Sequence, residues 1–201
     1  MGRRLSLTML LLLFFITAPG CGTSANTKFY LLRPMVEQSA PVEDLSGSAS
    51  VIGLGPIKLP EYLNRPQIVT TSGTSKLDLA DFHRWAEPLE QNFSRTLSEN
   101  LSAQLSESRV VLYPWDRSTT VNCQIKVDVV NFSGESNRRA VLDARWSVIK
   151  GGKVIVEKHS VFRQPLKSAE IEELVMAESL AVADFSKAIA ETIRTELRLA
   201  D

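Results

Sequence analysis

The chain has 201 residues, of which 44% are hydrophobic and 23% are charged, and this is the composition of one globular domain with its own core. Lys and Arg together number 23, as do Asp and Glu, so the formal net charge is zero. A chain with this balance gives no electrostatic basis for binding nucleic acid or anionic lipid headgroups.

The first twenty residues have the three parts of an export signal. Arg3 and Arg4 make a positive start, and residues 5–16 (LSLTMLLLLFFI) form an apolar run. This run is shorter than the roughly 20 residues that a membrane-spanning helix needs. Small residues at 17–20 (TAPG) then resemble a cleavage region. Residues 1–20 are therefore predicted to be a cleaved signal peptide of an exported protein.

Cys21 follows the predicted cleavage region, and the only other cysteine is Cys123. Apolar and polar residues alternate over 121–129, which predicts a strand with Cys123 on its buried face. A disulfide would require the N-terminal tail to reach into the core, so this pairing is disfavoured. The remaining interpretation is a lipoprotein signal, in which the Cys21 thiol and its newly exposed amine are acylated. Ala18 and Gly20 also suit an ordinary signal peptidase, so this alternative stays open at this point.

The rest of the chain alternates between strand and helix signals, with a Pro-, Ser- and Gly-rich loop predicted over 34–50. Glycine-containing turns separate several of the strand segments, including a Gly151-Gly152 hairpin. Strands are predicted over 28–32, 50–60, 67–71, 76–80, 109–113, 120–132, 140–148 and 153–162.

Two long helices complete the pattern, over 88–107 and 171–199. In each helix apolar residues recur at helical spacing and predict one buried stripe. The stripes are Leu89, Phe93, Leu97, Leu101 and Leu105 in the first helix, and Val175, Val182, Phe185, Ile189, Ile193 and Leu197 in the second. The predicted fold class is α+β: a two-layer sandwich of a mixed, largely antiparallel sheet with both helices packed on one face. The predicted organisation is a signal peptide (1–20), a lipidated tether (21–27) and one domain (28–201).

Few residues in the chain suggest chemistry. His83 and Glu87 have helical i, i+4 spacing, but no third metal ligand is near in sequence. His159 lies in a predicted strand. The sequence has no nucleophile elbow and no phosphate-binding loop. We therefore expect no catalytic residues, no metal, no cofactor and no enzymatic activity.

Two segments stand out, LPEYLNRPQIV at 59–69 and FHRWAEPLE at 82–90. In a structural interpretation, Tyr62 and Trp85 cover a sheet edge, and Arg65 or Arg84 pairs with a carboxylate such as Glu87. In a functional interpretation the same residues form a docking surface, since Tyr, Trp and Arg are frequent hot-spot residues. The residues alone leave both interpretations open.

The order of these two segments resembles the PqiC (YmbA) family of ABC-type transport auxiliary lipoproteins. The likeness extends from the KFYLL segment (28–32) to the closing helix. The residues that carry it, and that become candidates for partner docking, are Leu59, Pro60, Tyr62, Arg65, Pro66, Arg84, Trp85, Glu87 and Pro88.

This resemblance implies a periplasm-facing lipoprotein, usually of the outer membrane, anchored through acylated Cys21. It implies an accessory or docking role in an MCE-type system that moves lipids between membranes and maintains envelope integrity. The implied partners are an MCE-domain, PqiB-like periplasmic protein and its inner-membrane component. The resemblance also allows a homo-oligomer. The alternative is a periplasmic lipoprotein that itself binds a lipid or another hydrophobic ligand.

Overall fold

The computed structural model describes residues 26–35, 50–73, 75–135 and 138–198. The predicted signal peptide, Cys21 and most of the predicted tether and 34–50 loop lie outside these residues, so those expectations stay predictions.

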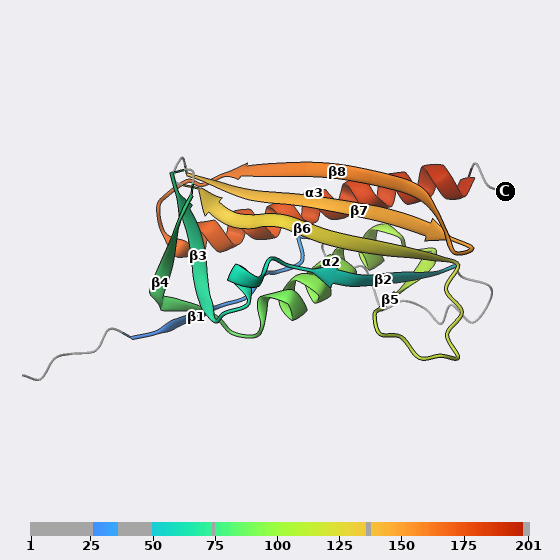
Figure 1. The fold of residues 1–201 in the computed structure, drawn as a ribbon, viewed down its shortest axis with the longest axis horizontal. Helices are drawn as coiled ribbons and strands as arrows, with labels where there is room; N and C mark the ends of the chain where they lie inside the picture. Colours follow the sequence, from blue (N-terminus) through green and yellow to red (C-terminus); the bar gives the residue numbers. More distant parts are fainter. Residues whose placement is uncertain (1–25, 36–49, 74, 136–137, 199–201) are drawn as a thin grey trace, which may run out of the picture.

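The described residues form one mixed sheet, two long helices and a short 3-10 helix (Figure 1). The strands are β1 (Lys28–Tyr30), β2 (Ser50–Lys58), β3 (Gln67–Ser72), β4 (Lys76–Trp85), β5 (Ser108–Leu112), β6 (Cys123–Glu135), β7 (Arg139–Lys150) and β8 (Lys153–Pro165). The helices are η1 (Glu61–Leu63), α2 (Leu89–Gln104) and α3 (Ile171–Arg198).

Strand β6 organises the sheet. One of its edges pairs with β7, which pairs in turn with β8, and both pairings are antiparallel. Its other edge is shared between β2, which runs parallel to its first half, and β3, which runs parallel to its last residues. Beyond β2 lies β5, and beyond β3 lie β4 and then β1. The same edge of β6 is therefore extended by two groups of strands, β2 with β5 and β3 with β4 and β1.

Helices α2 and α3 contact each other and form the second layer of the sandwich (Figure 1). The predicted stripe of α2 is buried, as is that of α3 as far as Ile193; the side chain of Leu197 lies outside the described residues. The rings of Phe93 and Phe132 meet edge to face between the layers, with their centroids 5.4 Å apart. The predicted fold class is confirmed.

Two local predictions can be compared directly with the structure. Cys123 is buried on the apolar face of β6, as predicted, and burial raises the pKa of its thiol. The prediction that β4 ends at residue 80 was wrong, because the strand continues to Trp85. The extension pairs with β1 in parallel register, with Tyr30 opposite Trp85. Local sequence periodicity does not predict a pairing between two strands that are far apart in the chain.

Candidate partner-docking site

The two segments singled out in the sequence lie next to each other in the fold. The first runs from the end of β2 through η1 into β3, and the second runs from the end of β4 into α2. The backbone N–H of Trp85 donates a hydrogen bond to the carbonyl oxygen of Pro66, at 2.7 Å. Gln67 and Arg84 are paired in the β3–β4 ladder. The antiparallel pairing of β3 with β4 thus joins the two segments.

A surface hollow of about 370 Å³ lies between these segments. It is lined by Leu59, Pro60, Glu61, Leu63, Asn64, Pro88, Leu89, Glu90 and Gln91. A neighbouring hollow of about 410 Å³ shares Glu90 and Gln91 with the first, and adds Leu54, Gly55, Pro56, Ile57, Ser94, Leu112, Tyr113 and Pro114. We call the two together the motif groove. Its walls combine apolar and polar side chains, and Glu61 and Glu90 are its acidic residues.

The start of α2 forms one wall of the motif groove. Pro88 precedes the first helical residue, and its carbonyl oxygen accepts hydrogen bonds from the N–H groups of Gln91 and Asn92. Leu89 is buried, whereas Pro88, Glu90 and Gln91 are exposed. The first turn of the helix therefore anchors itself in the core through Leu89 and presents polar side chains to the groove.

The candidate residues divide into buried and exposed members. Trp85 is only 5% exposed and belongs to the core. Tyr62 is half-buried; its hydroxyl donates to Oδ1 of Asn131 at 3.2 Å, and burial raises its pKa. Arg65, Pro66 and Pro88 are exposed. Arg65 and the two prolines are therefore accessible at the surface, while Trp85 packs in the core and its backbone N–H binds Pro66.

The expected pairing of Glu87 with Arg65 or Arg84 is not the pairing found. Glu87 forms a salt bridge with Arg95, and the hydrogen bond from Arg95 places the pKa of the guanidinium above its ordinary value. Arg95 also approaches Glu99 at 3.5 Å, one helical turn further along α2. Helix α2 starts two residues after Glu87, so the side chain of Arg95 on this helix can reach back to the Glu87 carboxylate. Within the described residues, Nε of Arg84 is buried without a hydrogen-bond partner.

The two histidines lie apart from the motif groove. His83 is on β4, so its helical spacing with Glu87 is not realised; its Nδ1 hydrogen bonds with the Tyr30 hydroxyl at 2.7 Å. His159 is on β8, with Nε2 2.6 Å from Oδ1 of Asp143. In the described part of the chain, no three His, Cys, Asp or Glu side chains gather in a way that could hold a metal ion.

Sequence reasoning missed a row of buried polar residues on α2. Asn92, Thr96 and Asn100 repeat every four residues and are fully buried. Their side chains hydrogen bond to the backbone of Leu32 and Met35, in the extended segment after β1. From α3, the Ser179 hydroxyl accepts a hydrogen bond from the N–H of the intervening residue, Arg33. The two helices thus hold the segment by its backbone. The signal was a polar row at helical spacing directly beside the apolar stripe.

The described domain is thus a two-layer α+β fold whose two most distinctive segments border a surface groove. No helix within the described ranges is both long and apolar enough to cross a membrane. The model of the family of ABC-type transport auxiliary lipoprotein components matches residues 30–190. The chain belongs to this family.

A relative of known name agrees with this assignment, and two solved structures share the fold. The chain is 26% identical to the "Intermembrane transport lipoprotein PqiC" of Escherichia coli K12 over 136 residues, which cover 68% of this chain and 71% of that protein. A crystal structure of an uncharacterized protein has the same fold, with a TM-score of 0.71 and 21% identity over 84% of this chain and 99% of its own. Protein XCC0632 from Xanthomonas campestris has a TM-score of 0.66 and 12% identity, over 86% and 99% of the two chains.

Proposed function

We propose that this chain is a periplasmic lipoprotein, anchored in the outer membrane through Cys21, that acts as a docking component of an MCE-type intermembrane lipid transport system. Its partner would be a PqiB-like MCE-domain protein with its inner-membrane component, and the assembly would maintain envelope integrity. The observation that carries the proposal is that both family motifs converge on one accessible groove. The E. coli relative, an intermembrane transport lipoprotein, supports a role in transport between membranes.

The packing of the domain favours docking over carrying a ligand. In the described residues, large side chains such as Phe93, Phe132 and Phe185 fill the layer between sheet and helices and are fully buried. The hollows that form the motif groove lie at the surface, beside η1 and the start of α2. A hydrophobic cargo needs a compartment that excludes water from most of its surface. A groove of this kind suits a protein segment better.

The anchor is tested by the intact mass of the protein extracted from membranes. The proposal expects the mass of the chain from Cys21 plus its acyl groups, in the outer-membrane fraction. Gly22 supports this location, since an aspartate there would favour retention at the inner membrane. Two or more acyl chains also hold a protein stably in a bilayer, where one chain does not. An unmodified protein in the periplasmic extract would overturn the anchoring.

Docking is tested by reversing one exposed charge beside the motif groove. Arg65→Glu should abolish co-purification with the MCE-domain protein, because Arg65 is exposed and lies two residues after the end of η1. Lys153→Glu is the matched control, with the same charge change on an exposed residue at the start of β8. Equal retention of the partner by both variants would remove the groove from the proposal while leaving the anchor untouched.

A further inference from the structure

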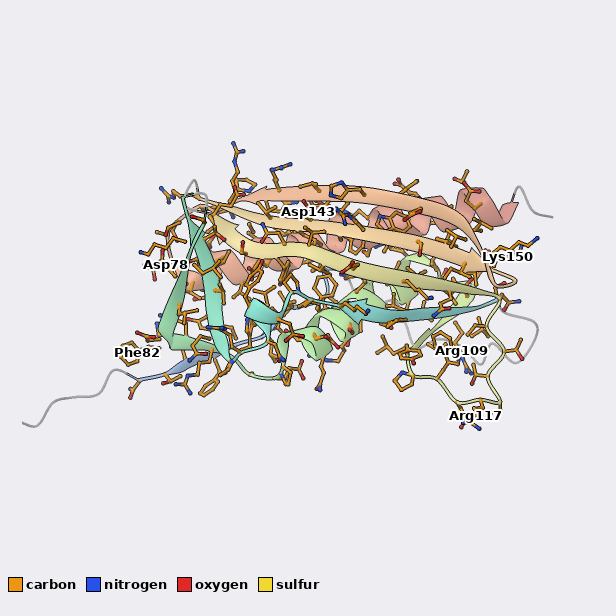
Figure 2. All side chains as sticks on the ribbon, in the orientation of Figure 1. Asp78, Phe82, Arg109, Arg117, Asp143 and Lys150 are labelled. Atoms are coloured by element: carbon orange, nitrogen blue, oxygen red, sulfur yellow. The ribbon has the colours of Figure 1, made fainter. Side chains whose placement is uncertain are left out.

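One end of the molecule carries large exposed apolar side chains. Phe29 on β1 is 64% exposed, Phe82 on β4 is 49% exposed, and Leu31 just after β1 is 40% exposed. We call these three residues the end patch. Figure 2 shows Phe82 at the end of the molecule formed by β1 and β4, with Lys150 at the opposite end. Leu77 and Leu79, earlier on β4, are also exposed, by 43% and 42%.

The end patch is held in place by strand pairing. Phe29 is paired with Arg84, two residues beyond Phe82, in the parallel β1–β4 ladder. Behind these strands Trp85 is buried, and Tyr30 stacks on His83 with ring centroids 5.6 Å apart. The residue after Leu31 is the buried Leu32, whose backbone is held by Asn92. The backbone that carries the end patch is therefore held in a fixed position by the sheet and by helix α2.

Cys21 is close to the end patch in the sequence, and this limits how far the patch can lie from an anchoring membrane. Asn26 is the fifth residue after Cys21, so these two residues are at most about 18 Å apart even when the chain is fully extended. Phe29 follows three residues later, and β1 begins at Lys28. An acylated Cys21 lies at the membrane surface. The end patch is thus the part of the folded domain that the anchor brings closest to lipid.

We propose that the end patch of Phe29, Leu31 and Phe82 rests in the interfacial layer of the lipid bilayer and orients the domain on the membrane. This inference rests on the anchoring in the proposed function. Apolar and aromatic side chains bind this layer by burying their surface about 5–10 Å deep. Lys28 and Asp81 adjoin Phe29 and Phe82 in the chain with opposite charges, and Arg84 pairs with Phe29 in the ladder. The patch thus carries little net charge, so its contact with the bilayer depends on apolar burial and requires no anionic lipid. The domain would then stand on β1 and β4, with the β7–β8 turn pointing away from the membrane.

The experiment uses the full, acylated chain in phosphatidylcholine vesicles. Acylation occupies the Cys21 thiol and Cys123 is buried, so Phe82→Cys provides a single accessible thiol for an environment-sensitive fluorophore. Val154→Cys is the matched control, since Val154 is 59% exposed near the β7–β8 turn. Lipids brominated near the top of the acyl chain should quench the label at residue 82 by about half or more, because the interface is shallow. The label at residue 154 should keep its emission.

A second pair of variants checks the patch itself. A label at Leu31→Cys should lose its quenching when Phe29→Ser and Phe82→Ser are combined, and should keep it at high salt in the otherwise unchanged chain. Vesicles that carry the protein while the label at residue 82 stays unquenched would overturn the inference and leave the anchor intact. Labels at residue 82 that quench one another, rather than respond to brominated lipid, would identify a second copy as the occupant and also overturn it. Failure of the protein to float with vesicles would instead contradict the anchoring.

Discussion

Oδ1 of Asn92 accepts a hydrogen bond from the backbone N–H of Leu32 at 2.7 Å, and both residues are buried. This contact joins the segment after β1 to helix α2, sixty residues later in the chain. An asparagine side chain here takes the place of a neighbouring strand, because it satisfies a buried backbone donor that has no ladder partner. The start of the domain is thereby fixed to the helix layer.

Replacing Asn92 tests this role. Asn92→Leu should lower the free energy of unfolding by about 1–3 kcal/mol, since the Leu32 N–H would stay buried without its acceptor. Urea denaturation followed by circular dichroism measures the change. Gln91→Ala is the control, because Gln91 is exposed and should shift stability by no more than about 0.5 kcal/mol. Equal midpoints for the two variants would show that the contact contributes nothing.

The fold was largely predictable because its main elements are periodic. The stripe of α2 and the alternation around Cys123 each describe a surface with one buried side, and both predictions were confirmed. What failed was non-local. The end of β4 depends on pairing with β1, and the buried polar row of Asn92, Thr96 and Asn100 depends on the segment after β1. In both cases the two contacting segments are far apart in the sequence, so a short stretch of sequence does not reveal the contact.

The candidate site was predictable as two segments but not as a surface. The sequence singled out Trp85 and Arg65 together, although the first is buried and the second is exposed. The sequence also did not indicate that Glu90 and Gln91 line both hollows of the motif groove. Residue type alone does not separate a side chain that supports a loop from one that a partner can reach. This distinction requires the packing of β3, β4 and α2.

Trp85 and Arg65 should therefore respond differently to substitution. Trp85→Ala should lower the free energy of unfolding by about 3–5 kcal/mol, because it empties a large buried site. Arg65→Ala should change it by no more than about 0.5 kcal/mol, as is usual for an exposed side chain. Thermal unfolding of the two purified variants compares them. A Trp85→Ala protein as stable as the parent would mean that the ring is not part of the core.

Gly134 allows α3 to approach β6 closely. A Cβ atom at this position would lie 2.8 Å from Cδ1 of the buried Leu174, which is closer than packed carbons approach. Gly134→Ala should cost about 1–3 kcal/mol of stability through overpacking. The cost should shrink in a Leu174→Ala background, where the opposing side chain is gone. A double-mutant cycle by urea denaturation measures this coupling, and additive costs would argue against the contact.

Glu178 is the clearest pH-sensitive group in the described residues. It is 1% exposed on α3, and within the described part Oε2 has no hydrogen-bond partner. Burial raises the pKa of this carboxyl from 4.5 to about 8. Below about pH 4.5 the carboxyl is protonated in both the folded and the unfolded chain, so it imposes no ionisation cost. Between these two pH values the unfolded chain releases the proton more readily, and stability falls as pH rises.

Glu178→Gln should remove this dependence. Relative to the parent, the variant should gain up to about 1.4 kcal/mol for each pH unit between the two pKa values. The gain should stop growing above about pH 8, where the folded parent also loses its proton. Urea denaturation from pH 4 to pH 9 measures the difference. Glu172→Gln, an exposed change on the same helix, is the control. Parallel pH profiles for the parent and Glu178→Gln would show that Glu178 ionises in the folded protein much as it does in the unfolded chain.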